Sequence, residues 1–146
     1  AVGLGVVAVA GADAPPAVSP VEEYVTVVVP DLLAGYEHVE DLAQAELGDR
    51  AAVRDPARSD RIRDQVLPRL REVLVDAETF QPATAEIGAA HDAVLRALRA
   101  KQTALEAYAT GLRSGDPRAF ALGEDASTEE LQAFRQWAAA IAALDP

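Results

Sequence analysis

The chain has 146 residues, enough for one domain with a substantial buried core, and it carries a formal net charge of -11 with no cysteine. The absence of cysteine excludes disulfides, thiolate metal sites and cysteine nucleophiles. The acidic balance argues against nucleic acid and anionic membrane surfaces as partners, because basic residues recognise both.

Residues 1–19 differ in composition from the rest, and we separate them from a helical domain at 20–146. Residues 1–12 are apolar, but a helix that crosses a bilayer alone needs roughly 20 residues. Three interpretations stay open: the end of a transmembrane or signal segment, a strand or short helix packed on the domain, or an N-terminus after removal of Met. A Pro-rich linker follows at 13–19.

A capping box at 19–22, with Pro20 at the first helical position, predicts a helix over 20–47 that Gly48 ends. The β-branched run at 25–29 would also suit a strand. We predict a helix there, because the helical spacing of apolar residues continues through the run.

An apolar stripe over 62–77 predicts a second helix, which begins at Asp55 or Ser59 and ends before Pro82. The first helix contains seven acidic residues and no basic one, whereas seven arginines lie within 50–71. Such opposite charges predict that these two helices are neighbours.

The longest helical pattern covers 84–114, capped by its own first residue and ended by Gly115. A helix of that length would be roughly 46 Å long at 1.5 Å per residue. The dipeptide at 116–117 then predicts a short helical turn closed by Gly123. A capping box at 127–130 predicts the start of a last helix.

These patterns predict an all-α fold: an antiparallel up-down helical bundle of three long helices and one shorter C-terminal helix. Pro30 and Pro68 each follow two aliphatic residues in the middle of a helix. We expect both to kink their helices, because proline removes a backbone donor and crowds a carbonyl.

The sequence lacks the motif of a di-metal carboxylate site, in which Glu lies three residues before His on a helix. Gly35 and Gly88 occupy that position before His38 and His91. The serines lie at predicted helix ends, where capping explains them, so we predict no catalytic residue and no cofactor.

Some polar residues remain candidates for binding. The metal candidates are His91, His38, Glu37 and Asp41, and the small-ligand candidates are Tyr36 and His91. The alternatives are a buried His91, hydrogen-bonded within the core, and a solvated acidic face at 37–41.

The arginines within 50–71 either bind an anion or pair with the acids between them. Three glycines lie inside the predicted helices: Gly35, Gly88 and Gly111. Glycine is unfavourable in a helix interior, so these positions indicate either close helix crossing or room for a ligand.

We therefore expect a non-enzymatic binding or assembly domain whose partner is a protein or its own membrane-anchored region. The first basic residue is Arg50, so the N-terminal flank lacks the Lys/Arg excess of cytoplasmic loops. This favours an extracytoplasmic, membrane-tethered or secreted domain; a gene that encodes no hydrophobic segment before residue 1 would contradict the tether. Two alternatives are a metal- or small-ligand-binding bundle and an accessory or regulatory domain of a larger membrane enzyme whose catalytic part lies upstream.

Overall fold

The structure is a computed structural model that describes residues 17–48 and 52–145, and within these ranges it is all-helical, with no strand. The predicted all-α class is confirmed. The apolar segment at 1–12 and most of the linker lie outside the described residues. Of the helices described, none combines the length and the apolar character that a membrane span requires.

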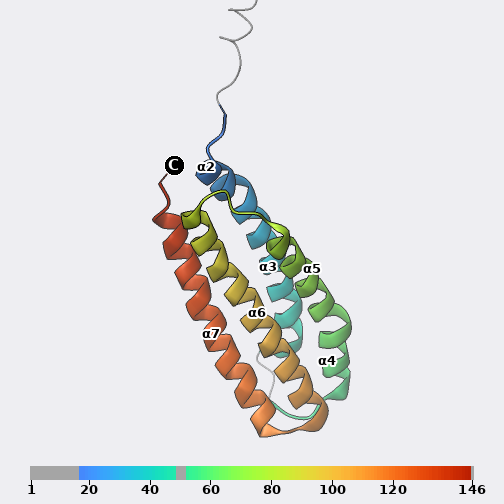
Figure 1. Ribbon diagram of the computed structural model, residues 1–146. Coiled ribbons are helices and arrows are strands. Elements are labelled where there is room, and N and C mark those ends of the chain that lie inside the picture. Colours follow the sequence, from blue (N-terminus) through green and yellow to red (C-terminus); the bar gives the residue numbers. More distant parts are fainter. Residues whose placement is uncertain (1–16, 49–51, 146) are drawn as a thin grey trace, which may run out of the picture.

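Four helical segments make up the described chain. The first consists of α2 (Pro20–Glu23), the π turn η1 (Tyr24–Val28) and α3 (Val29–Leu47). The second consists of α4 (Pro56–Arg61), the π turn η2 (Ile62–Val66) and α5 (Leu67–Thr79). Each of the other two is one uninterrupted helix, α6 (Ala85–Ser114) or α7 (Pro117–Ala142). Figure 1 shows the four segments side by side, with α2 and the end of α7 at one end of the molecule and α4 and the α6–α7 turn at the other.

The predicted caps form as hydrogen bonds at two helix starts. The Ser19 hydroxyl accepts from the Glu22 N–H at 3.1 Å, and the Thr84 hydroxyl accepts from the Ile87 N–H at 3.2 Å. Gly115 follows α6 with a φ of 76°, the left-handed conformation that suits glycine at a helix end. The boundaries of the first and third segments were therefore predictable from local signals.

Asp55, not Ser59, begins the second segment. The Asp55 side chain accepts from the Arg58 N–H at 3.2 Å. Ser59 is buried inside α4 and donates to the Ala109 carbonyl of α6 at 2.7 Å. The Asp55 N–H donates to the Leu112 carbonyl at 2.6 Å, so the start of α4 is fixed to the end of α6 by backbone groups.

Each mid-helix proline comes two residues after the last residue of a π turn. In η1 the N–H of Val29 donates to the carbonyl of Tyr24, five residues back, and the equivalent bond closes η2. The wider turn accommodates Pro30 and Pro68, which have no N–H to donate. The helical prediction for 25–29 is confirmed, with 25–28 in the π turn and Val29 as the first residue of α3. Bending at the prolines stays a prediction.

The predicted helix end at Gly123 is wrong, because α7 is one helix of 26 residues that runs through this position. The count is four long segments, not three long helices and a shorter one. A Cβ atom at Gly123 would lie 2.7 Å from Cε1 of Tyr108, so glycine here permits close approach of α6 and α7. Ser127, predicted as a cap, lies within α7, with its Oγ 3.4 Å from the Tyr108 hydroxyl oxygen.

All four segments contribute to one hydrophobic core. Full burial of a large aliphatic side chain contributes about 1.5–3 kcal/mol, so this core supplies most of the favourable free energy of folding. The largest fully buried side chains are Tyr24, Val39, Ile62, Val66, Leu67, Leu70, Ile87, Val94, Leu98, Leu105, Leu112 and Trp137. The first two segments are neighbours, as their charges predicted: α3 packs on α5, and Arg61 Nε lies 2.9 Å from both carboxylate oxygens of Glu46.

Two glycine substitutions test whether close helix crossing explains the glycines. A Cβ atom at Gly35 would lie 2.8 Å from Cγ2 of Val73, whereas at Gly88 the nearest atom is in Pro82, 3.7 Å away. We expect Gly35→Ala to lower the free energy of unfolding by about 1–3 kcal/mol through overpacking. The matched control Gly88→Ala is expected to raise it by about 0.5–1 kcal/mol, because alanine favours helix. Urea titration measures both, and a Gly35→Ala protein as stable as the control would contradict close crossing.

Candidate functional site

The buried histidine belongs to a network at the α2 end, the Tyr24 network, formed by Tyr24, His91, Trp137 and the Ala77 carbonyl. Trp137 Nε1–H donates to the Tyr24 hydroxyl at 3.0 Å, and that hydroxyl lies 3.1 Å from His91 Nδ1. His91 Nε2 lies 2.6 Å from the Ala77 carbonyl oxygen, which can only accept. The network therefore assigns the proton to Nε2 and leaves Nδ1 to accept from Tyr24. Both ring nitrogens are used within the core.

The remaining metal candidates lie elsewhere, on the surface. His38 is exposed and accepts from Arg69 Nε at 2.9 Å, and Glu37 and Asp41 are exposed on the same helix. Within residues 17–48 and 52–145, no three His, Asp or Glu side chains lie close enough together to hold a metal ion. The structure therefore does not bring the predicted set together with His91.

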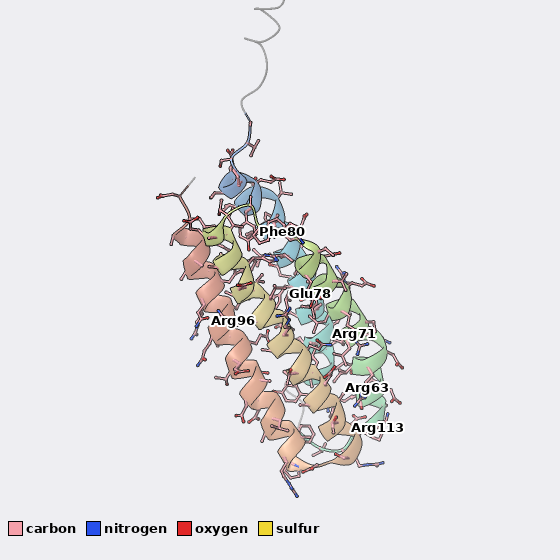
Figure 2. All side chains as sticks on the ribbon, in the orientation of Figure 1. Arg63, Arg71, Glu78, Phe80, Arg96 and Arg113 are labelled. Atoms are coloured by element: carbon pink, nitrogen blue, oxygen red, sulfur yellow. The ribbon has the colours of Figure 1, made fainter. Side chains whose placement is uncertain are left out.

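The arginines of the second segment contact the end of α3. Arg58 is buried, and its Nε donates to the backbone carbonyl of Glu46 at 2.7 Å, with a second bond from Nη2 to the same oxygen. Positive charge at a helix C-terminus is favourable. Other arginines, such as Arg63 and Arg113, are exposed (Figure 2) and contact Thr110 and Asp60 respectively.

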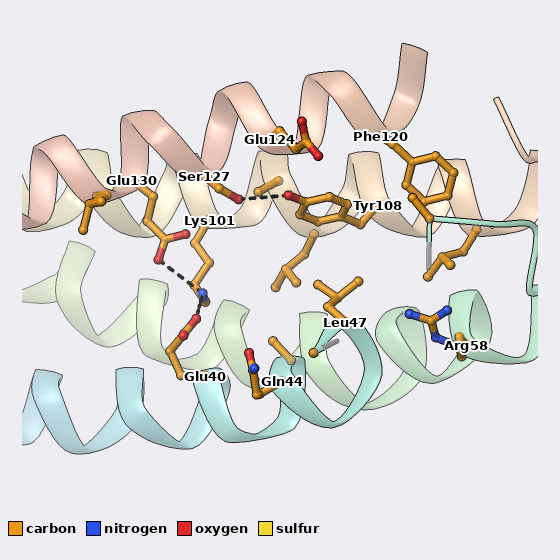
Figure 3. Close-up of a pocket in the computed structure, with 17 residues that line it drawn as sticks. Glu40, Gln44, Leu47, Arg58, Lys101, Tyr108, Phe120, Glu124, Ser127 and Glu130 are labelled. Atoms are coloured by element: carbon orange, nitrogen blue, oxygen red, sulfur yellow. Dashed lines mark hydrogen bonds and ion pairs between the residues drawn. The ribbon is translucent and has the colours of Figure 1, made fainter. Parts of the chain in front are cut away.

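A further polar group in the core is the Lys101 cluster, formed by Tyr36 and Glu40 of α3, Lys101 of α6 and Glu130 of α7. Lys101 Nζ donates to Glu40 Oε1 and, at 3.2 Å, to Glu130 Oε2 (Figure 3). The Tyr36 hydroxyl donates to the same Glu130 oxygen. Lys101 Nζ also lies 5.2 Å from the centre of the Tyr36 ring, within the range of a cation–π interaction.

The Lys101 cluster is unusual because two of its charged side chains are buried. The Lys101 and Glu130 side chains are only 6% and 10% exposed, whereas Glu40 is 46% exposed. Removing an ammonium and a carboxylate from water costs several kcal/mol per ion unless each is paired and hydrogen-bonded. With one cation and two carboxylates, the cluster carries a net negative charge.

Burial raises the pKa of both core tyrosines above the ordinary value. For Tyr36 burial is the largest cause, followed by donation of its hydroxyl to Glu130 and by the negative charges of Glu130 and Glu40. Burial also raises the pKa of Tyr24, and the hydrogen bond from Trp137 partly offsets that effect. Both phenols therefore stay protonated in the folded protein at neutral pH.

A cavity of about 440 Å³, the lateral cavity, opens between α3, α4, α6 and α7 (Figure 3). Lys101, Glu40 and Glu130 form part of its wall, and apolar side chains form much of the rest. The lining residues are Glu40, Ala43, Gln44, Leu47, Gly48, Ala52, Arg58, Lys101, Ala104, Leu105, Tyr108, Leu112, Phe120, Glu124, Ser127, Glu130 and Leu131. The ligand candidate Tyr36 contacts this wall through Glu130, whereas His91 is in the Tyr24 network.

The sequence analysis missed Lys101 and Glu130. A signal existed: Lys101 lies on the apolar stripe of its helix between Leu98 and Leu105, and Glu130 lies four residues before Phe134 and seven before Trp137. A charged residue on the buried face of a helix needs a partner from another helix. The chain has a single lysine, which made the position easier to notice.

The lining of the lateral cavity contains few of the side chains considered for catalysis in the sequence analysis. Its one serine, Ser127, has the Tyr108 hydroxyl as its neighbour, and neither histidine is among the lining residues. Comparison with protein-family models, with curated proteins and with solved structures gave no match.

The raised pKa of Tyr36 predicts how stability changes at high pH. Above the ordinary value of 10.0, the unfolded phenol loses its proton while the folded one keeps it, so stability falls as pH rises. We expect Tyr36→Phe to reduce the slope of unfolding free energy against pH by up to one proton, about 1.4 kcal/mol per pH unit. Urea titrations from about pH 9 to about pH 11 measure it. Equal slopes for the two proteins would show that the Tyr36 phenol is not held neutral by folding.

Proposed function

We propose that this protein is a non-enzymatic helical domain that binds a small organic ligand in the lateral cavity. The observation that carries the proposal is a space of about 440 Å³ between packed helices, with apolar walls and a few fixed polar groups. Ligand pockets commonly occupy about 300–1,000 Å³ and often lie between the helices of a bundle.

The residues that line the cavity include both apolar and polar side chains, as a ligand-binding site requires. Leu47 and Tyr108 are partly buried and Leu131 is exposed, so these lining residues supply apolar surface that a ligand would remove from water. Gln44 and Glu124 are exposed polar side chains at the same cavity, available to orient a ligand. Burial of apolar surface gives affinity, and a small number of polar contacts gives orientation.

Two observations favour binding over the alternatives of catalysis and metal binding. The buried ammonium of Lys101 is held by two carboxylates, so it is not a free nucleophile. Both nitrogens of His91 are hydrogen-bonded within the core, and Nδ1 of His38 accepts from Arg69. A metal ion bound by His91 would have to break one of its core contacts first, and His38 has only Nε2 to offer.

We further propose an antiparallel up-down arrangement of the four segments, with the first two bent at Pro30 and Pro68. Its support is that each of the four segments extends from one end of the molecule towards the other (Figure 1), and that a π turn precedes each proline. The apolar stretch at 1–12 and the absence of basic residues before Arg50 support an extracytoplasmic setting or a membrane tether. The cavity would then face the compartment outside the cytoplasm.

A fluorescent probe tests the binding role. N-phenyl-1-naphthylamine is neutral at pH 7 and brightens in apolar surroundings, so we expect saturable fluorescence enhancement with wild-type protein. Ser127→Phe places a ring in the cavity and is expected to abolish the enhancement. The control Thr128→Phe adds the same ring at the next position of α7, which is exposed and outside the lining, and should bind as wild type does. Circular dichroism verifies that both variants fold.

Two results would contradict the proposal. One is the absence of saturable enhancement with the wild-type protein. The other is binding by Ser127→Phe at the wild-type affinity, which would place the probe outside the lateral cavity.

A further inference from the structure

We infer that the ligand of the lateral cavity is an amphipathic amine, with one cationic head group and an aliphatic body. This inference rests on the proposed binding role and adds the chemical class of the ligand. It follows from which charged groups at the cavity are already paired and which remain available.

The two cationic side chains at the cavity are both occupied. Lys101 Nζ contacts Glu40 and Glu130, and the Arg58 guanidinium makes two hydrogen bonds to the Glu46 carbonyl. A carboxylate or phosphate ligand would have to compete with Glu40 and Glu130 for Lys101, or with the Glu46 carbonyl for Arg58, and displacing Glu130 would leave a buried carboxylate without its cation. Such a loss is costly, so an anionic head group is disfavoured.

The carboxylates, in contrast, keep acceptor capacity. Both Tyr36 and Lys101 donate to Glu130 Oε2, while Glu130 Oε1 takes no hydrogen bond from any residue that the structure describes. Figure 3 shows only one of the two Glu130 oxygens joined to Lys101. Glu130 lines the cavity and is nine-tenths buried as a side chain, but no fully buried side-chain oxygen among the described residues lacks a hydrogen-bond partner. Its second oxygen is therefore accessible from the cavity and can accept from a donor there.

A second carboxylate lies on the same face of α7. Residues 124, 127 and 130 follow one another at three-residue spacing, and all three line the cavity. Glu124 is exposed and makes no salt bridge with the described residues. An ammonium group has three donors and no acceptor, which matches a wall that offers carboxylate oxygens at two levels.

The apolar part of the lining suits an aliphatic body. Leu47 of α3, Tyr108 of α6 and Leu131 of α7 present accessible carbon surface to the cavity, above the fully buried Leu105 and Leu112. The net charge of the whole chain, -11, also raises the local concentration of cations around it. The carboxylates and the apolar lining of the cavity therefore favour the same class of ligand, an amphipathic amine.

Three ligands of equal chain length test the inference by isothermal titration calorimetry at pH 7 and low salt. The ligands are n-octylamine, n-octanol and n-octanoate. We expect the amine to bind about tenfold tighter than the alcohol, because charge-assisted hydrogen bonds are roughly twice as strong as neutral ones. The carboxylate should bind most weakly.

Glutamate-to-glutamine variants identify the carboxylate that binds the ammonium head group. Glu130→Gln keeps the shape and the bonds from Tyr36 and Lys101 but removes the charge, so amine and alcohol should bind within about twofold of each other. The matched control Glu129→Gln changes the exposed neighbour, which does not line the cavity, and should keep the full preference. If Glu130→Gln fails to fold, Glu124→Gln provides a second test on an exposed side chain, with an expected loss of about threefold in amine affinity.

The outcomes separate this inference from the proposed function. Equal binding of amine and alcohol, or tighter binding of octanoate, would overturn the amine and leave the cavity as a binding site. No binding of any of the three, together with no binding of the naphthylamine probe, would remove the proposed function as well. Retained amine preference in Glu130→Gln and in Glu124→Gln would show that the head group binds elsewhere.

Discussion

The buried ammonium of Lys101 is the constraint on which the arrangement of α3, α6 and α7 depends. Its two carboxylate partners come from two other helices, Glu40 from α3 and Glu130 from α7. Sliding one helix by a turn, about 5.4 Å, would leave a charge in the core without a partner. Apolar side chains tolerate such shifts better because their contacts are not directional. We therefore attribute the register of the three helices to this cluster, with the apolar core supplying the stability.

The packing of the interior differs between the two ends of the molecule. At the α2 end, aromatic and imidazole rings fill the core: the ring centres of Tyr24 and Phe80 lie 5.4 Å apart, and those of Phe80 and His91 4.8 Å apart. Beyond the Lys101 cluster, small residues such as Ala43 and Ala104 face the interior, and the lateral cavity opens there. The Lys101 cluster thus lies between the aromatic packing of the α2 end and the lateral cavity, and Lys101, Glu40 and Glu130 line that cavity.

Local signals predicted the helical segments because a cap, a glycine and an apolar stripe act within a few residues of one another. Gly123 misled the prediction, since glycine marks both helix ends and close helix contacts, and only the position of Tyr108 distinguishes the two. Lys101 and Glu130 escaped notice because a stripe analysis follows apolar residues. The cavity itself depends on how four segments meet, which spacing along the chain does not determine. The two histidines drew attention by residue type, yet they take part in the Tyr24 network and in a surface contact.

A double-mutant cycle on Lys101 and Glu130 tests the register claim most directly. Lys101→Met leaves Glu130 buried without its cation and is predicted to lower the free energy of unfolding by about 3–5 kcal/mol. The Lys101→Met/Glu130→Leu protein, with an apolar pair in place of the charges, is predicted to recover most of that loss, giving a coupling energy above about 1.5 kcal/mol. Urea titration of the four proteins measures it. Costs that add to within about 0.5 kcal/mol would mean that the two side chains do not interact, and would contradict the account.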